Sequence, residues 1–367
     1  MENSSHRELL CLGESPIPEV MADLAAALVG IGPALSFGPI SRTHVPNQVA
    51  VVVATSGTTG ESKEVGITAK ALLASAKASN QFLEAKYGQV WSLLLPLTHV
   101  AGINVLVRSL ELGTTPLDLR DASEYPRADF TAIVPTQLFR ALNGDTQLLE
   151  HLKNCKAVLV GGAPLSDSVH RAAADAGIKI VTTYGMTETC GGCVYNGVPM
   201  TGVEIDTSDA KIRIKGATIA FSYLNDEQGW RDSFSNGWFI TKDLGTIVSG
   251  KLIILGRTDD VIISGGENIS LSAIEGALHE AFKENEFAAF SIPDAEWGNA
   301  LHIAIAGDHP VPTDQISSYL EKTLGVVAKP KGFLILSVLP MIGIGKVDQK
   351  ALVQAVLERK ALVDDLT

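Results

Sequence analysis

Residues 55–63 bring together the side-chain types that bind phosphate groups. They read Thr-Ser-Gly-Thr-Thr-Gly-Glu-Ser-Lys and follow an apolar run, residues 49–54, that is typical of a buried strand. Glycine opens backbone conformations that other residues avoid, hydroxyls and loop amides can bond phosphate oxygens, and lysine supplies a countercharge. We therefore predict a phosphate-binding loop, with an ordinary Ser/Thr/Gly-rich turn as the alternative. The candidate phosphate ligands are Thr55, Ser56, Gly57, Thr58, Thr59, Gly60 and Lys63.

This loop is not a Walker A motif. A Walker A loop has a glycine, then four residues, then Gly-Lys-Ser/Thr, whereas here Gly57, Gly60 and Lys63 have another spacing and Glu64 follows. The Walker class of nucleotide-binding proteins is therefore excluded.

Other predicted strands also end in polar or glycine-rich turns. Residues 90–96 run into a polar turn, residues 157–160 precede Gly161-Gly162-Ala163, and residues 178–182 precede Tyr184-Gly185. Short strands that are apolar on both sides are typical of a parallel sheet with helices on both faces. Because ligands bind beyond the carboxyl ends of such strands, we expect these turns to converge on one site.

The composition is that of an acidic globular protein. The chain has 367 residues, 46% of them hydrophobic, which is enough for a large core and two or three domains. A formal net charge of −12 disfavours general attraction to nucleic acid or anionic membranes. The cysteines are few and scattered, which suits a reducing compartment, and neither a secretory signal nor a membrane-spanning apolar run is found. We expect a cytoplasmic protein without membrane insertion or a nucleic-acid partner.

The pattern predicts an α/β fold with two domains. Residues 1–256 form the large domain, with mainly parallel sheets flanked by helices and a small antiparallel β subdomain at about 203–256. Residues 257–367 form a small α+β domain, with helices at 271–284, 313–324 and 348–360 and strands near 287–292 and 301–306.

Several segments, in this order, resemble the adenylate-forming acyl-CoA synthetases. They are the loop at 55–63, Leu-Pro-Leu-Thr-His-Val-Ala-Gly at 95–102, Thr-Tyr-Gly-Met-Thr-Glu-Thr at 183–189, Lys-Asp-Leu-Gly at 242–245, the stretch from Gly256 to Ile269, and Gly-Ile-Gly-Lys-Val-Asp at 343–348. Each would be weak alone, but the resemblance extends from about residue 49 to the C-terminus.

The resemblance implies a ligase that uses ATP, Mg²⁺ and coenzyme A. A carboxylate would attack the α-phosphate of ATP and release pyrophosphate, and the acyl group would then pass to the thiol of coenzyme A. Bringing two anions together requires cations and amide donors. Residues 55–60 would hold the β,γ-phosphates, with Lys63 balancing their charge; a solvated lysine is the alternative.

The same resemblance assigns roles around the nucleotide. Glu188 would bind Mg²⁺, as a carboxylate suits a hard cation, and Thr187 would bond the α-phosphate. Tyr184 would stack on adenine, beside Gly185 and a slot formed by Gly161, Gly162 and Ala163; a packed aromatic residue before a turn is the alternative.

Two cations and a carboxylate from later segments complete the implied site. Asp243 would accept from both ribose hydroxyls, and Arg257 would donate to ribose or phosphate. Lys346 would enter the site for adenylation and leave it for thioester formation. An exposed turn and a solvated lysine are the alternatives for Asp243 and Lys346.

The resemblance also implies a moving C-terminal domain. Asp259 matches the hinge position, and Ser264, Gly265 and Gly266 would face the pantetheine arm in the second pose. Trp297 would line the same tunnel, unless it is a core residue. His99 occupies the gate between the ATP side and the tunnel, and a general-base role is less favoured.

Cys190 and Cys193 lie two residues apart, as in zinc or redox motifs. No second Cys/His pair has metal spacing, and two glycines separate them directly after Glu188. We therefore expect a wall of the acyl pocket here and no metal or redox site.

Within the family the chain is most similar to the compact ligases that act on 2-succinylbenzoate in menaquinone biosynthesis. It departs from the family in a short region before the phosphate loop and in Phe-Ser-Tyr at 221–223, where Gly-Tyr is usual. The short region makes a homodimer a candidate assembly. A second substrate carboxylate calls for a donor, for which the candidates are Arg108, Arg140, Ser166 and Thr201.

Other readings stay open on sequence alone. The acid could be another aryl or fatty acid, the acceptor could be a carrier protein, although no carrier segment follows Lys346, or the chain could bind nucleotide without turnover. The joint presence of Glu188, Asp243, Arg257 and Lys346 disfavours the last.

Overall fold

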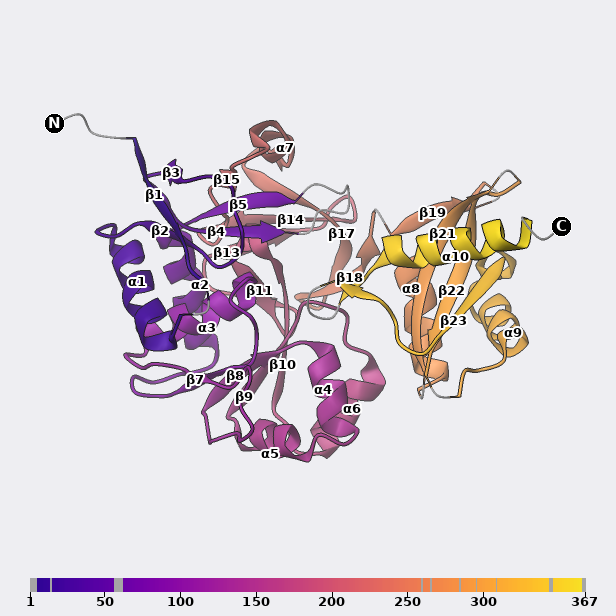
Figure 1. Cartoon of the computed structure of the whole chain (residues 1–367), viewed down its shortest axis with the longest axis horizontal. Helices are drawn as coiled ribbons and strands as arrows, with labels where there is room; N and C mark the ends of the chain where they lie inside the picture. The colour runs from indigo at the N-terminus through magenta and orange to yellow at the C-terminus, as the bar shows by residue number, and fades with distance from the viewer. Residues whose placement is uncertain are drawn as a thin grey trace. The chain divides into compact units, whose positions relative to one another are not determined.

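The computed structural model describes residues 5–13, 15–55, 62–258, 260–264, 266–283, 285–294, 296–307, 309–342 and 346–364 (Figure 1). Side chains are described for these residues except 342, 346 and 359–364. The chain divides into two compact units. Unit 1 comprises Met1–Leu165, Val169–Thr241 and Thr246–Ile253, and unit 2 comprises Ser166–Ser168, Lys242–Gly245 and Ile254–Thr367.

A six-stranded mixed sheet in unit 1 carries the ends of the phosphate loop. Its strand order is β15 (Ser222–Tyr223), β5 (Lys63–Thr68), β4 (Val49–Thr55), β2 (Ala34–Ser36), β1 (His6–Cys11) and β3 (His44–Pro46). The first five residues of β4 are buried, as the apolar run predicts. After the loop, the chain returns along β5 as the second strand of an antiparallel hairpin, on which Val65 and Ile67 are fully buried. Helix α2 (Ala69–Phe82) begins only after this strand.

The second sheet of unit 1 confirms the predicted parallel sheet. Its order is β12 (Val198–Pro199), β11 (Gly191–Tyr195), β10 (Ile180–Met186), β9 (Ala157–Val160), β8 (Phe130–Ile133), β6 (Trp91–Leu93) and β7 (Leu117–Asp118). Strands β10, β9, β8, β6 and β7 are parallel, and β11 and β12 are antiparallel.

Helices cover both faces of this sheet (Figure 1). Helices α1 (Ile17–Val29), α2 (Ala69–Phe82) and α3 (Val100–Glu111) lie on the side of the six-stranded sheet, where α2 contacts both sheets. Helices α4 (Pro135–Leu142), α5 (Thr146–Asn154) and α6 (Asp167–Asp175) bury Leu138, Leu152 and Ala173 against Val158 and Val160 on the other face.

A small antiparallel sheet follows, as predicted. It contains β13 (Val203–Asp206), β14 (Lys211–Gly216), β16 (Phe234–Ser235), β17 (Trp238–Val248) and β18 (Lys251–Arg257), with helix α7 (Glu227–Asp232) before β16. Ser249 and Gly250 join β17 to β18 with φ of 51° and 76°, which is the backbone of a tight hairpin turn. Both long strands contribute residues to each unit.

Unit 2 is an α+β layer structure. Its sheet contains β20 (Glu267–Ser270), β19 (Val261–Ser264), β22 (Gly298–Ala306), β21 (Glu286–Asp294) and β23 (Gly332–Leu336), and its helices are α8 (Leu271–Ala281), α9 (Thr313–Leu324) and α10 (Gln349–Asp364). Because side chains alternate along β21, Phe287 packs in the core under α8 and α9, while Phe290 packs with Leu352 of α10. Short elements complete the fold: η1 (Thr187–Thr189), η2 (Val326–Ala328), β24 (Met341–Ile342) and β25 (Lys346–Val347).

Candidate active site

The described ends of the phosphate loop are held together by strand pairing. Thr55 pairs with Lys63 across β4 and β5, and the Ser62 hydroxyl donates to the Thr55 carbonyl at 2.9 Å. The loop therefore starts and ends at one point of the sheet. The predicted ligands Ser56, Gly57, Thr58, Thr59 and Gly60 lie outside the described residues.

Lys63 is held at the base of the loop by an aromatic ring and a carboxylate. Its Nζ lies 3.9 Å from the centroid of the Tyr223 ring and 3.9 Å from Asp226 Oδ2. Both partners come from the segment around β15, which pairs with β5. These contacts keep a cation next to the predicted phosphate site.

Glu188 lies in the short η1 turn that directly follows β10. Its Oε1 accepts a hydrogen bond from the Tyr223 hydroxyl at 2.7 Å, and its carbonyl accepts from Ala220 N at 2.8 Å. Thr187 is the first residue of the same turn. The carboxylate and Lys63 thus share Tyr223 as a neighbour, so the structure brings these two predicted site residues close together.

The predicted adenine slot is assembled from neighbouring strand ends. Strands β9 and β10 pair in parallel up to Val160 and Thr182, so the turn at Gly161–Ala163 lies beside Tyr184 and Gly185. A Cβ on Gly161 would collide with the Thr183 hydroxyl, and a Cβ on Gly185 with the Gly191 carbonyl. The backbones of neighbouring strands approach so closely at Gly185 that this position requires glycine, whereas a side chain at Gly161 would displace the Thr183 hydroxyl.

Asp243 and Arg257 form an ion pair within unit 2. Asp243 lies on β17 and Arg257 on β18, and Arg257 Nη1 donates to Asp243 Oδ1 at 2.9 Å. The Asp243 side chain is only 9% exposed. The hairpin of β17 and β18 therefore brings together two of the residues predicted from separate motifs.

Three other predicted residues lie together on the sheet of unit 2. Ser264 is buried at the end of β19 and pairs with Gly298, the residue after Trp297. The Trp297 ring lies 3.5 Å from Lys331 Nζ, and Gly266 adopts a φ of +86°. Gly265 and Asp259, the predicted hinge residue, lie outside the described residues.

Lys346 is placed by its backbone alone. It opens β25 and pairs with Ile342 of β24 in a two-stranded hairpin of unit 2. Its side chain lies outside the described part of the structure.

His99 precedes the first turn of helix α3. Its Nδ1 is 3.0 Å from the Thr98 hydroxyl, and partial burial lowers the pKa of the ring below its ordinary value. The imidazole is therefore mostly neutral at neutral pH.

The sequence profile of the family described as AMP-binding enzyme matches residues 3–220, more than half of the chain. The chain belongs to the AMP-binding enzyme family. The predicted phosphate loop, Glu188 and the predicted glycine slot at 161–163 all lie within the matched residues.

The named relatives of this AMP-binding enzyme include ligases and synthetases whose names contain succinylbenzoate. A protein of Mycobacterium tuberculosis strain H37Rv, named "Probable 2-succinylbenzoate--CoA ligase", is 40% identical over 332 residues, 85% of this chain and 85% of the relative. The o-succinylbenzoate CoA synthetase of Bacillus subtilis, solved with the acyl-adenylate intermediate OSB-AMP, is 27% identical with a TM-score of 0.73, over 85% of this chain and 70% of that one. The same enzyme solved with ATP and magnesium ion has a TM-score of 0.72 and 26% identity, over 87% and 73%.

The Cys190–Cys193 pair is buried in unit 1. Burial raises the pKa of both thiols, that of Cys193 to about 12, so both are protonated at neutral pH. The Cys190 carbonyl accepts from Asn104 Nδ2 at 2.6 Å and from the Ser75 hydroxyl at 3.1 Å, which ties helices α2 and α3 to this turn. Neither thiol has the lowered pKa of a reactive cysteine.

Among the candidates for a second carboxylate, Arg108 differs from the rest by its burial. It is 3% exposed, whereas Arg140 and Thr201 are exposed and Ser166 is partly exposed. Arg108 Nη2 donates to the Tyr195 hydroxyl at 3.1 Å, and the guanidinium lies 5.0 Å from the centroid of the Trp91 ring. No carboxylate of the described residues pairs with it, and its Nε has no hydrogen-bond partner there.

Tyr223 contacts two predicted site residues, Glu188 and Lys63, and the sequence pattern does not reveal this role. Its contact with Glu188 spans 35 positions and depends on β15 joining the edge of the six-stranded sheet. The only signal in the sequence is the unusual Phe-Ser-Tyr triplet at 221–223.

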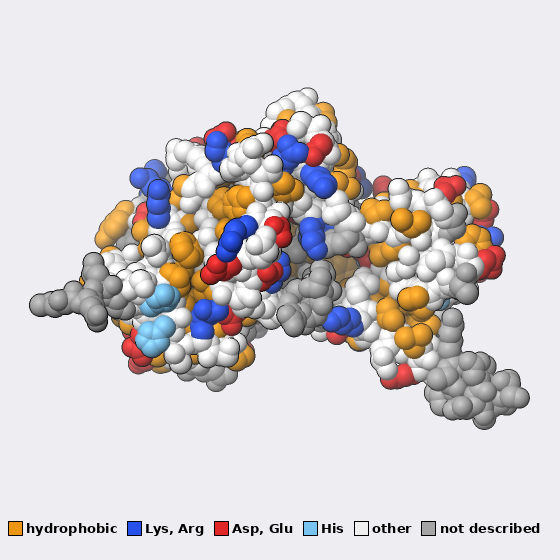
Figure 2. All heavy atoms as spheres, turned by 90° about the horizontal axis from the view of Figure 1, so that it is seen from above, with side chains coloured by type: hydrophobic (Ala, Val, Ile, Leu, Met, Phe, Trp, Pro, Cys, Tyr) orange, Lys and Arg blue, Asp and Glu red, His pale blue; other side chains and the backbone are white. Residues whose placement is uncertain are grey.

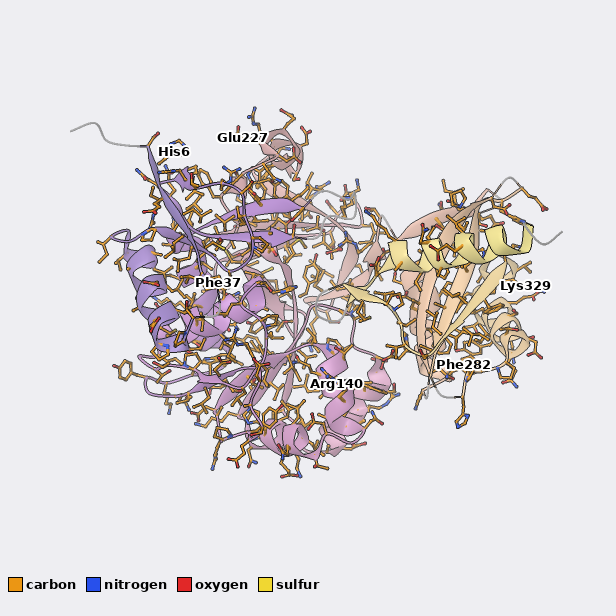
Figure 3. The ribbon with its side chains drawn as sticks, viewed as in Figure 1. His6, Phe37, Arg140, Glu227, Phe282 and Lys329 are labelled. Atoms are coloured by element: carbon orange, nitrogen blue, oxygen red, sulfur yellow. The ribbon has the colours of Figure 1, made fainter. Side chains whose placement is uncertain are left out.

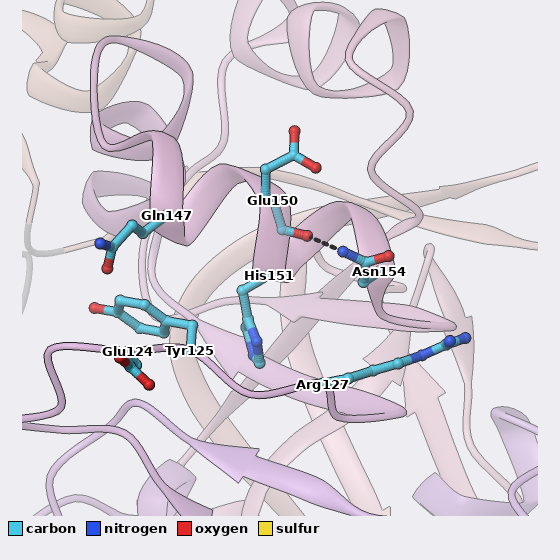
Figure 4. A pocket seen from close by; sticks show the side chains of 7 residues that line it. All are labelled: Glu124, Tyr125, Arg127, Gln147, Glu150, His151 and Asn154. Atoms are coloured by element: carbon cyan, nitrogen blue, oxygen red, sulfur yellow. Dashed lines mark hydrogen bonds between the residues drawn. The ribbon is translucent and has the colours of Figure 1, made fainter.

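One pocket of unit 1 is lined by none of the predicted site residues. This shallow pocket of about 390 Å³ is lined by Glu124, Tyr125, Arg127, Gln147, Glu150, His151 and Asn154 (Figure 4).

In the part of the chain that the structure describes, no helix is both long and apolar enough to cross a bilayer. On the face seen in Figure 2, hydrophobic, basic and acidic side chains all occur at the surface. Figure 3 draws the side chains as sticks, with Arg140 of helix α4 among those labelled.

Proposed function

We propose that this AMP-binding enzyme is a 2-succinylbenzoate–CoA ligase that acts in menaquinone biosynthesis. It joins the acid to ATP as an acyl-adenylate, releases pyrophosphate, and transfers the acyl group to coenzyme A. The observation that carries the proposal is the 40% identity to the M. tuberculosis relative across 85% of both chains. The site geometry supports the same chemistry.

Glu188 and Lys63 of unit 1 would serve Mg²⁺ and the phosphates. The Tyr223 hydroxyl donates to Glu188 Oε1, and among the described residues no hydrogen bond is made to Oε2. Oε2 is therefore the carboxylate oxygen that would bind a hard cation. Bound Mg²⁺ would neutralise charge on the phosphate oxygens. Lys63, next to the loop, would add a second positive charge on the side of the departing pyrophosphate. Thr187 would donate to the α-phosphate.

The nucleoside would be held by residues of several predicted motifs. Tyr184 and Gly185, with the glycine slot at 161–163, would bind adenine at the strand ends. Asp243, oriented by Arg257, would accept hydrogen bonds from the ribose hydroxyls.

Buried Arg108 would bind the second carboxylate of the acid. A guanidinium removed from water without a paired carboxylate among the described residues is costly, and a dianionic substrate would offset that cost. The hydrogen bond from Arg108 Nη2 to the Tyr195 hydroxyl orients the guanidinium group.

The thioester step would use a second pose of residues 257–367. Asp259 would be the hinge, and Ser264, Gly265, Gly266 and Trp297 would line the pantetheine tunnel, with His99 as its gate. Lys346 would lie in the site only in the pose that forms the acyl-adenylate. In this proposal, the ligase alternates between two arrangements of its domains.

The substrate assignment is tested by pyrophosphate release. With ATP and coenzyme A, 2-succinylbenzoate is expected to give a kcat/KM at least about 100-fold above that of benzoate, because a site that ion-pairs a second carboxylate rejects acids that lack it. In one comparison fatty acids replace 2-succinylbenzoate, and in another a carrier protein replaces coenzyme A. Faster turnover with any of these would contradict the assignment, and no turnover with any acid would favour a nucleotide-binding protein without catalysis.

We also propose that the ligase is cytoplasmic and homodimeric. Its four cysteines are free, which suits a reducing compartment. Sedimentation equilibrium would measure the mass of the assembly.

A further inference from the structure

Tyr223 contacts both charged residues of the phosphate site. Its hydroxyl donates to Glu188 Oε1 at 2.7 Å, and its ring lies 3.9 Å from Lys63 Nζ. Tyr223 itself is only 4% exposed, whereas the side chain of its partner Lys63 is 33% exposed. One side chain therefore meets the metal-binding carboxylate at its edge and the loop lysine at its face.

The position of Tyr223 is fixed by its surroundings. In β15 it pairs with Val65 of β5, and the Trp230 ring packs edge-on at 5.0 Å. The Tyr223 hydroxyl donates a hydrogen bond to Glu188, which engages one carboxylate oxygen and orients the other.

The same segment also fastens the base of the loop. Leu224 N donates to the Glu64 carbonyl at 2.7 Å, and Glu64 N donates to Asn225 Oδ1 at 2.8 Å. Asn225 Nδ2 donates in turn to the Ser62 carbonyl at 2.8 Å. Residues 223–225 thus hold the end of the phosphate loop by backbone and amide contacts, while Tyr223 adds the link to Glu188.

We propose that Tyr223 is a positioning residue for the adenylation step, which sets the Glu188 carboxylate and the Lys63 ammonium at a fixed separation for Mg²⁺·ATP. This inference rests on the proposed function for the identity of the nucleotide and the metal. Tyr223 need not touch either one: it acts through the orientation of Glu188 and the location of Lys63.

The two contacts of Tyr223 can be separated by substitution. Tyr223→Phe removes the hydrogen bond to Glu188 and keeps the ring under Lys63. Tyr223→Leu removes both. Tyr319→Phe, a tyrosine packed against Phe282 in unit 2, is the matched control for loss of a phenol hydroxyl.

Calorimetric titration with a non-hydrolysable ATP analogue, with Mg²⁺ or with EDTA, is the deciding measurement. For Tyr223→Phe we expect Mg²⁺-dependent affinity to fall about tenfold, as for loss of a residue that orients a metal ligand, with affinity in EDTA unchanged. For Tyr223→Leu we expect affinity in EDTA to fall as well, because Lys63 loses the aromatic ring and keeps only its contact with Asp226. Tyr319→Phe should match the parent in both conditions.

A double-mutant cycle distinguishes positioning from a general structural role. In a Glu188→Gln background, Tyr223→Phe should weaken Mg²⁺-dependent binding no further, because its effect passes through that carboxylate. Unchanged or tighter Mg²⁺-dependent binding in Tyr223→Phe, or equal loss with and without Glu188, would overturn the proposal. No acid enters these titrations, so a wrong substrate assignment would leave their outcome intact.

Discussion

Lys346→Ala is expected to slow acyl-adenylate formation by roughly 10²–10³-fold, the range for removing a charge donor from a transition state. The lysine would contact developing negative charge only while the acid attacks the α-phosphate. Thioester formation from supplied acyl-adenylate should be largely retained, because the proposed second pose does not use Lys346. Pyrophosphate release and adenylate-to-thioester conversion, followed separately under single-turnover conditions, measure the two steps.

Lys350→Ala is the matched control, since Lys350 is an exposed lysine on helix α10 near β25. It should leave both half-reactions close to those of the parent. Equal loss of both half-reactions in Lys346→Ala would show that the lysine does not serve adenylation alone.

Arg108→Met is expected to lower kcat/KM for 2-succinylbenzoate by about 100-fold or more, since a buried charge-assisted contact to the second carboxylate is lost. Turnover of benzoate, which has no second carboxylate, should change much less. Methionine fills a similar apolar volume beside Trp91, and Arg108→Lys should recover part of the activity because it keeps the charge.

Arg140→Met provides the control for loss of an arginine, because Arg140 is exposed at the end of helix α4. A thermal melt of each variant separates a folding defect from a binding defect. Parallel loss with both acids at unchanged stability would count against Arg108 as the carboxylate ligand.

Local patterns predict much of the fold. The short apolar strands β8, β9 and β10 and the helices α8, α9 and α10 are found close to their predicted ranges, because buried strands and amphipathic helices have strong local signatures. Strands β19 and β20 were not predicted, since Gly265 and Gly266 between them read as a loop. Strand β5 was missed because only Val65 and Ile67 of its short length are strongly apolar.

The site is less predictable because its contacts are long-range. The motifs indicate Glu188 and Lys63, but their common neighbour Tyr223 follows only from the pairing of β15 with β5. Likewise, the sequence offers several donors for a second carboxylate without ranking them. Arg108 is buried because helix α3 is packed against β6, β8 and β11 and against helices α1 and α2, which no local pattern reports.

Isotope tracing tests the central claim, adenylation followed by thioester formation, most directly. The acid carrying ¹⁸O in its carboxylates is incubated with ATP and coenzyme A, and the products are analysed by mass spectrometry. Attack by a carboxylate oxygen on the α-phosphate predicts AMP that contains one ¹⁸O, unlabelled pyrophosphate, and a 2-succinylbenzoyl thioester. Unlabelled AMP, or ADP with labelled inorganic phosphate, would contradict it.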